Sequence, residues 1–281
     1  MTVPERWAEV GDGVLVRRHR HLDLNVGLVV GAEWCLVVDT RSTQRQGEQL
    51  RAAVRAVTAA PWIVVNTHAH YDHCFGNAAF VPTEIWGHPR AVEVLCADGE
   101  TQRAELSDTA REQGATALAA DLERTPIVPP TREVTDCVDL DLGDRRVRLS
   151  HLGRGHTDND LVVEVEDAAV LFAGDLVEQG APPAFEDAFP LDWPATLDRL
   201  LARAAERVVP GHGAVVDPEF VAEQTELIRE VSCVAIEAHA AGREIDDLVA
   251  QRVMPLGSEV ARHALQRAYR QLGDPARGTR G

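Results

Sequence analysis

Short apolar runs bounded by turn residues dominate the first part of the chain. Three runs of strand character stand at residues 14–17, 25–30 and 34–38, and glycines at positions 11, 13 and 31 separate them. Runs of this length between turn signals predict β-strands. Residues 44–57 then place Leu50, Val54 and Val57 at the spacing of one helix face, and the apolar run 62–66 predicts another strand.

A second half repeats this pattern as topology, without a residue-level repeat. Strands are predicted at 147–149, 161–166, 169–172 and 208–209, with a helix at 191–206 before the last of them. Hairpin strands combined with a strand-helix-strand alternation predict mixed sheets covered by helices, an α+β protein.

Helical patterns outside this repeat define the remaining organisation. The charged, alanine-rich stretch 98–124 predicts one or two inserted helices, which form either a solvated flap or a lid, and residues 220–241 and 245–254 continue as helices. We therefore predict one domain over 1–215 with the insertion at about 98–124. Helices within 216–281 pack on the same domain or on a second subunit, which leaves a homodimer open.

A cluster of candidate ligands follows the apolar run 62–66. The sequence Thr67-His68-Ala69-His70-Tyr71-Asp72-His73 holds three imidazoles and one carboxylate. A buried cluster of histidines must satisfy every ring nitrogen, so this density is typical of a transition-metal site.

Three further motifs each follow or interrupt a predicted strand. They are Gly155-His156-Thr157, Ala173-Gly174-Asp175 and Pro210-Gly211-His212-Gly213. A glycine beside each candidate ligand lets the backbone turn sharply and approach a metal closely. Alone, each motif is better explained by a loop hydrogen bond, a helix cap or a turn. The order of all three after the histidine cluster favours a shared metal site.

Together with Val37-Val38-Asp39-Thr40, these motifs resemble the metallo-β-lactamase superfamily over roughly residues 10 to 215, with a ligand set similar to that of glyoxalase II. The resemblance implies a four-layer αββα sandwich with its site at one edge. It also implies one metal held by His68, His70 and His156, a second held by Asp72, His73 and His212, and Asp175 as a bridge.

Coordination chemistry supports this grouping. Three neutral imidazoles leave an open position for a hydroxide, and carboxylates add the charge that holds a second ion. We expect two divalent ions, zinc by default, although iron or manganese suits the same ligands. Asp72 is the predicted catalytic residue that holds or passes the hydroxide's proton. The resemblance makes Asp39 an acceptor that orients a ligand histidine.

Substrate-binding residues are expected in the loop 178–193. Phe185 and Trp193 offer apolar rings for the uncharged part of a substrate, or Trp193 anchors the following helix. Arg154 suits a substrate carboxylate through its planar fork, or it lies on the surface. The sequence leaves both choices open.

Charge excludes several classes of function. The net charge is −17, and all 28 basic residues are arginine. Without lysine there is no Schiff-base or P-loop chemistry, and strong acidity argues against nucleic acid or anionic membranes as partners. Five scattered cysteines and an amino terminus without a signal-like pattern predict reduced thiols in a cytoplasmic protein.

These observations predict a metal-dependent hydrolase in which a hydroxide on a dinuclear centre cleaves a small carbonyl substrate, namely an ester, thioester, lactone or amide. The alternatives are a β-lactamase, a mononuclear-iron oxygenase similar to persulfide dioxygenases, and a binding protein that keeps only the fold. The complete set of seven candidate ligands disfavours the last two.

Overall fold

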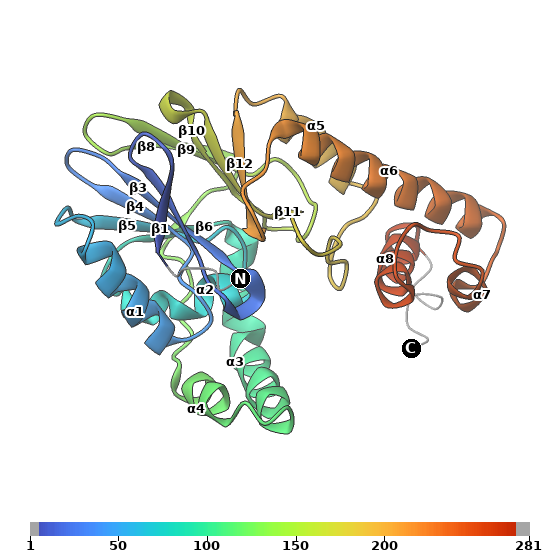
Figure 1. Cartoon of the computed structure of the whole chain (residues 1–281). Helices are drawn as coiled ribbons and strands as arrows, with labels where there is room; N and C mark the ends of the chain where they lie inside the picture. The colour runs from blue at the N-terminus through green and yellow to red at the C-terminus, as the bar shows by residue number, and fades with distance from the viewer. Residues whose placement is uncertain (1–5, 274–281) are drawn as a thin grey trace.

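Two β-sheets pack face to face with helices on both outer sides. The structure is a computed structural model that describes residues 6–273; residues 1–5 and 274–281, at the ends of the two predicted regions, lie outside the described part. Figure 1 shows α1 (Gln44–Arg55) on one side of the sandwich, and α5 (Trp193–Leu201) with α6 (Pro218–Ala240) on the other. The predicted αββα sandwich is confirmed.

The first sheet has seven strands in sequence order. They are β1 (Trp7–Gly11), β2 (Val14–Arg18), β3 (Asn25–Val30), β4 (Cys35–Val38), β5 (Trp62–Val65), β6 (Ile85–Gly87) and β7 (Arg132–Glu133). Neighbouring strands are antiparallel as far as β4 and parallel from β4 onward. The parallel part brings the carboxyl ends of β4 and β5 to the same edge, where the candidate ligands begin.

The second sheet has five strands in the order β12-β11-β10-β9-β8. They are β8 (Cys137–Asp141), β9 (Arg146–Ser150), β10 (Val162–Val165), β11 (Val170–Glu178) and β12 (Arg207–His212). Only β11 and β12 pair in parallel. The short strands β1, β6, β7 and β8 were not predicted, and α5 is shorter than the predicted helix 191–206.

Three apolar layers explain why the strands are so hydrophobic. In β4, Leu36 and Val38 enter the core between the sheets, whereas Val37 packs with Leu50 of α1 on the outer side. Side chains alternate between the faces of a strand, so a strand covered on both faces is apolar throughout. The third layer joins the second sheet to α5 and α6.

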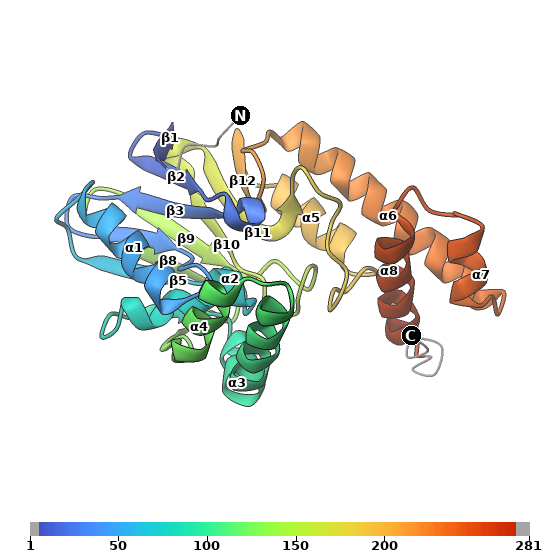
Figure 2. The same ribbon diagram turned by 60° about the horizontal axis from the view of Figure 1, so that its bottom comes forward.

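The inserted helices lie behind the histidine-rich loop. They are α3 (Pro89–Glu112) and α4 (Thr116–Arg124), so the insertion begins earlier than the predicted residue 98. Ala110, Ala119 and Leu122 pack in one cluster with Ala69 and Phe75. Figure 2 shows α3 and α4 beside α2 (Tyr71–Cys74). These helices therefore support the loop that carries the candidate ligands.

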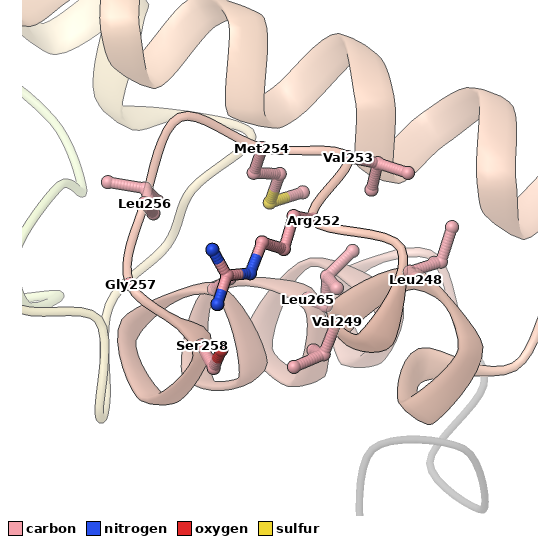
Figure 3. A pocket seen from close by; sticks show the side chains of 10 residues that line it. Leu248, Val249, Arg252, Val253, Met254, Leu256, Gly257, Ser258 and Leu265 are labelled. Carbon is pink, nitrogen blue, oxygen red and sulfur yellow. The ribbon is translucent and has the colours of Figure 1, made fainter.

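The carboxy-terminal helices share a core with the second sheet. After α6 come α7 (Ile245–Ala250) and α8 (Ser258–Gln271), the second of which was not predicted. Leu248, Met254 and Leu265 belong to the same buried cluster as Leu176 of β11. A cavity of about 220 Å³ lies where α7 meets α8 (Figure 3).

Other predictions concern membranes and cysteines. Within residues 6–273, every helix is too short or too polar to span a lipid bilayer. The five cysteines are free thiols, and Cys35 and Cys74 are buried. The cytoplasmic location, the absence of nucleic acid and membrane partners, and the homodimer stay predictions.

Candidate metal centre

Asp39 fixes the start of the histidine-rich loop. It follows β4 with a left-handed φ of 65°, at the edge where β5 also ends. Its carboxylate accepts hydrogen bonds from the backbone and the hydroxyl of Thr67, both at 2.8 Å. The Nδ1 atom of His73 lies 2.8 Å from the same carboxylate, so His73 presents Nε2 to the site. The structure thus places Asp39 in the orienting position that the resemblance implied.

The second sheet brings the other candidate ligands to this loop. Strands β11 and β12 run parallel, which places Asp175 within β11 beside His212 at the end of β12. Gly211 leaves the necessary room, because a Cβ at this position would lie 1.7 Å from an Asp175 carboxylate oxygen. His156 lies on the loop that follows β9. Asn159 on the same loop accepts a hydrogen bond from the backbone amide of Ala69 at 2.9 Å and so joins this loop to the histidine-rich loop.

All seven predicted ligands meet in two groups. The ligand atoms within each group lie within 4.8 Å of one another; the groups are His68, His70, His156 and Asp175, and Asp72, His73 and His212. Asp175 also reaches the second group, because its oxygens lie 3.2 Å from His73 Nε2 and 3.3 Å from His212 Nε2. The arrangement is that of a bridging carboxylate.

The distances between donor atoms fit metal ions. In a tetrahedral zinc site with metal–nitrogen bonds of about 2.0–2.1 Å, neighbouring ligand atoms lie about 3.4 Å apart. Here Asp175 Oδ2 lies 3.7 Å from His68 Nε2 and 3.5 Å from His156 Nε2, and Asp72 Oδ2 lies 3.4 Å from His212 Nε2. The Nε2 atom of His68 is buried without a hydrogen-bond partner, as a nitrogen that ligates a cation would be.

The electrostatics also favour a cation. Burial alone would lower the pKa of His73, but the carboxylates of Asp175, Asp72 and Asp39 hold it well above its ordinary value. At His68, burial prevails and lowers the pKa, with neighbouring histidines adding to the effect. Three carboxylates packed among imidazoles thus attract positive charge, which two divalent ions can supply in place of protons.

A cavity of about 640 Å³ opens beside these groups. His70, Asp72, His156, Asp175 and His212 line its polar floor. Leu22, Tyr71, Ala181 and Ala184 supply apolar wall. None of the residues 98–124 lines this cavity, so the inserted helices are not a lid over it in this structure.

The sequence analysis missed four carboxylates that line this cavity, and two of them, Asp187 and Glu178, interact with the candidate ligands. Asp187 Oδ2 lies 3.1 Å from His70 Nε2, which leaves Nδ1 of His70 facing His156 at 2.9 Å. Although burial lowers the pKa of His70, Asp187 raises it to about 9. Burial and the nearby Asp175 raise the pKa of Glu178 to about 8. Both residues lie in the loop 178–193, in which the sequence analysis predicted the apolar rings, not the carboxylates, as substrate-binding groups.

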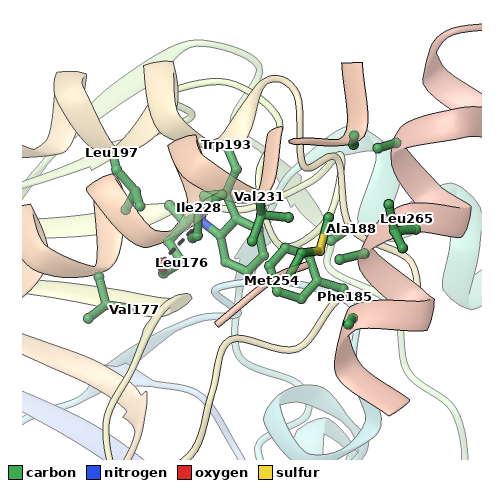
Figure 4. Packing of buried hydrophobic residues seen from close by; sticks show 14 of the residues in the cluster. Leu176, Val177, Phe185, Ala188, Trp193, Leu197, Ile228, Val231, Met254 and Leu265 are labelled. Atoms are coloured by element: carbon green, nitrogen blue, oxygen red, sulfur yellow. Dashed lines mark hydrogen bonds between the residues drawn. The ribbon is translucent and has the colours of Figure 1, made fainter. Parts of the chain in front are cut away.

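Phe185 and Trp193 correct one expectation. These residues are only 1% and 0% exposed and belong to the buried cluster around Leu176 and Ile228, which Figure 4 shows. The Trp193 indole donates a hydrogen bond to the Leu176 carbonyl at 3.2 Å, and its ring centroid lies 5.9 Å from that of His156. These rings therefore anchor the loop and the helix rather than contact a substrate.

Arg154 corrects a second expectation. Its guanidinium pairs with Asp192 at 2.5 Å and lies over the Phe189 ring, 4.6 Å from the centroid. It does not line the cavity. Of the two roles left open for Arg154, the structure favours the surface role, because its planar fork is engaged by a carboxylate of the protein itself.

Comparison with known proteins identifies the class. The model of the metallo-beta-lactamase superfamily matches residues 21–212, a span that contains every candidate ligand. The chain belongs to the metallo-beta-lactamase superfamily and is a metallo-hydrolase of that class.

Individual relatives are more distant. The chain is 28% identical to the acyl-coenzyme A thioesterase MBLAC2 of Bos taurus over 225 residues, which is 72% of this chain and 79% of that protein. It is 26% identical to a metallo-beta-lactamase type 2 of Bacillus cereus over 150 residues, covering 50% of this chain and 59% of that protein.

Solved structures share the fold. A metallo-beta-lactamase from Pontibacter korlensis matches with a TM-score of 0.62 at 20% identity, covering 80% of this chain and 98% of that one. The mono-zinc form of FIM-1 from Pseudomonas aeruginosa matches with a TM-score of 0.61 at 18% identity, covering 81% and 96%. At these identities the likeness concerns the fold alone.

Proposed function

We propose that this protein hydrolyses a small carbonyl substrate, such as an ester, thioester, lactone or amide, at a centre of two divalent metals. The observation that carries the proposal is the convergence of seven buried or half-buried ligands in two groups that Asp175 joins. Two divalent ions bound there would activate a water near neutral pH and polarise the carbonyl oxygen. Zinc is the expected ion, and iron or manganese suits the same ligands.

The chain's own residues have separate tasks in this reaction. Water adds to the carbonyl carbon, the bond to the leaving oxygen, sulfur or nitrogen breaks, and the leaving atom takes up a proton. Asp72 lines the cavity beside His212, where it can hold and pass that proton as well as bind metal. The apolar wall at Leu22, Tyr71 and Ala184 suits the uncharged part of an acyl group.

A thioester is the first bond to test, because the relative with 28% identity is named an acyl-coenzyme A thioesterase. A β-lactam is the second candidate, supported by three metallo-beta-lactamases that are 25% to 27% identical. The iron oxygenase requires only one metal, so the presence of two complete ligand groups argues against it.

The test is an activity panel. Protein loaded with zinc, iron or manganese is assayed with a thioester, an aryl ester, a lactone, a β-lactam and a phosphodiester, while elemental analysis gives the metal content. We expect at least one carbonyl substrate to be turned over far faster than the phosphodiester. Phosphodiester hydrolysis well above every carbonyl substrate would overturn the proposal.

A matched pair of variants assigns the activity to the site. His70→Ala removes one candidate ligand, and His239→Ala removes a histidine on α6 that packs against Tyr269. Only His70→Ala should lose activity and metal. Full activity in both variants would point to a contaminating enzyme, and equal loss in both would point to a general loss of folding.

A further inference from the structure

The rim of the cavity is acidic beyond what the metal ligands require. Besides Asp72 and Asp175, four carboxylate residues line the cavity, and no lysine or arginine lines it among the described residues. These four are Asp23, Glu178, Glu186 and Asp187. Two divalent ions would carry more positive charge than Asp72 and Asp175 neutralise, but they would lie on the floor and leave the four rim carboxylates in place.

The four rim carboxylates differ in their surroundings. Asp23 is neutralised by Arg18, whose guanidinium donates two hydrogen bonds to it. Glu178 is buried, with 7% exposure. Glu186 and Asp187 face solvent at the opening, with side-chain exposures of 65% and 53%. Glu186 lies 3.4 Å from Nδ1 of His263, and Asp187 lies 3.1 Å from Nε2 of His70. A histidine that ligates a metal through its other nitrogen is neutral, so in the metal-loaded site these exposed carboxylates would still present negative charge to an arriving substrate.

Nearby arginines offset this charge only in part: Arg267 attracts the Asp187 carboxylate but does not line the cavity. Arg267 of α8 donates to the backbone carbonyls of Ala188 at 2.7 Å and Asp187 at 2.5 Å. Arg154 is paired with Asp192. A substrate anion in the cavity would therefore meet carboxylates without a cation to bind it, apart from the ions on the floor.

We propose that this site selects acyl substrates without a negative charge and discriminates against anionic ones, including coenzyme A thioesters and β-lactam carboxylates. Like charges in a partly enclosed cavity repel, and the cost appears as lost transition-state binding. This inference rests on the proposed acyl hydrolysis and narrows its substrate class. It also predicts that this chain prefers other substrates than the relative named an acyl-coenzyme A thioesterase, since coenzyme A carries several phosphate charges.

A matched substrate pair tests the proposal. The same acyl group is offered as the coenzyme A thioester and as the N-acetylcysteamine thioester, which has the same scissile bond but no charge. We expect kcat/KM to be at least tenfold higher for the neutral thioester, equivalent to about 1.4 kcal/mol. Added salt should lower the ratio of kcat/KM for the neutral thioester to that for the anionic one, because screening weakens repulsion at an exposed rim.

Charge reversal at the rim gives the second arm. Glu186→Arg should raise the ratio of anionic to neutral turnover at least threefold. Glu84→Arg changes the global charge equally, but Glu84 precedes β6 at the end of the sheet opposite the site and pairs with Arg132. This control should leave both rates unchanged.

The possible outcomes are distinguishable. If both thioesters are cleaved and the anionic one is equally fast or faster, the charge selectivity is wrong and the acyl hydrolysis stands. The charge selectivity is also wrong if the ratio of anionic to neutral turnover is the same in Glu186→Arg as in Glu84→Arg. If the metal-loaded protein cleaves neither thioester nor any other carbonyl substrate, the proposed function fails and the selectivity fails with it.

Discussion

The floor and the rim of the cavity are built in different ways. Five of the floor ligands lie on segments that follow β5 and β9, whereas Asp175 lies within β11 and His212 ends β12. Asp39 orients His73, and Asn159 holds the backbone of the histidine-rich loop. The rim loop 178–192 has no regular structure over most of its length and is held by α8. A further hydrogen bond joins the Leu191 amide to Gln271 of the same helix at 3.0 Å.

This difference separates chemistry from selectivity. Ligands within strands or just after them are positioned by the sandwich itself, so the metal site follows from the fold. The rim depends on helices distant in sequence, so related proteins can change it while they keep the metal site. Substitutions in the two regions should accordingly alter different measured quantities.

The largest effect is expected from Asp175→Ala. The bridging carboxylate contacts histidines of both ligand groups, and its loss leaves neither group complete. We expect kcat/KM to fall by a factor of at least about 10³, with metal content reduced below two ions per chain. Steady-state kinetics and elemental analysis measure both. Near-wild-type turnover at full metal content would refute the assigned role, as would one ion at saturation in the unmodified protein.

Trp193→Ala should act mainly on stability. Because the ring is fully buried in the core, its removal is expected to lower the free energy of unfolding by about 3–5 kcal/mol. Trp34, which is 40% exposed, supplies the control variant Trp34→Ala with an effect of about 0.5 kcal/mol or less. Urea denaturation distinguishes them; a pure KM effect of Trp193→Ala at unchanged stability would restore its role in substrate binding.

Asp39→Asn tests the support beneath the floor. The substitution keeps the shape but replaces an acceptor of the His73 ring N–H by an amide. We expect metal affinity in the second ligand group to fall about 10–100-fold. Competition with a chromogenic chelator measures this change. An affinity that stays unchanged would mean that His73 is oriented by its packing alone.

Arg267→Ala is expected to have the smallest effect, confined to the rim. Without its guanidinium, the carbonyls of Asp187 and Ala188 lose their donors, so the loop should loosen and KM rise a few-fold at unchanged metal content. Arg262→Ala on the same helix removes an exposed pair with Asp246 and serves as the control. Metal loss in Arg267→Ala alone would show that floor and rim are coupled.

Sequence patterns predicted the floor better than the rim. Four ligands are marked by their clustering directly after an apolar strand, and the other three by a preceding glycine that permits a sharp turn or close approach of the backbone. By contrast, the apolar rings of Phe185 and Trp193 look the same in a sequence whether they face a cavity or a core. Asp187 carried no local signal, since its contact with His70 joins residues 117 positions apart.

The same limits explain the errors in the fold. Apolar runs such as β4 and β5 are long enough to stand out, whereas β7 has two residues, both exposed, and follows no hydrophobic pattern. In the carboxy-terminal region, α8 buries a mostly small face of alanines with Leu265 and Tyr269. Such a face gives little contrast between apolar and polar positions.

The origin of the ligands has a consequence for the life of the protein in a cell. Four of them leave the first sheet, and three come from the second, so bound ions would fasten the two sheets together much as a crosslink does. Metal-binding free energy then adds to folding free energy. A chain short of metal would open more often along this seam and be degraded sooner, so the amount of this protein would follow the cell's metal supply.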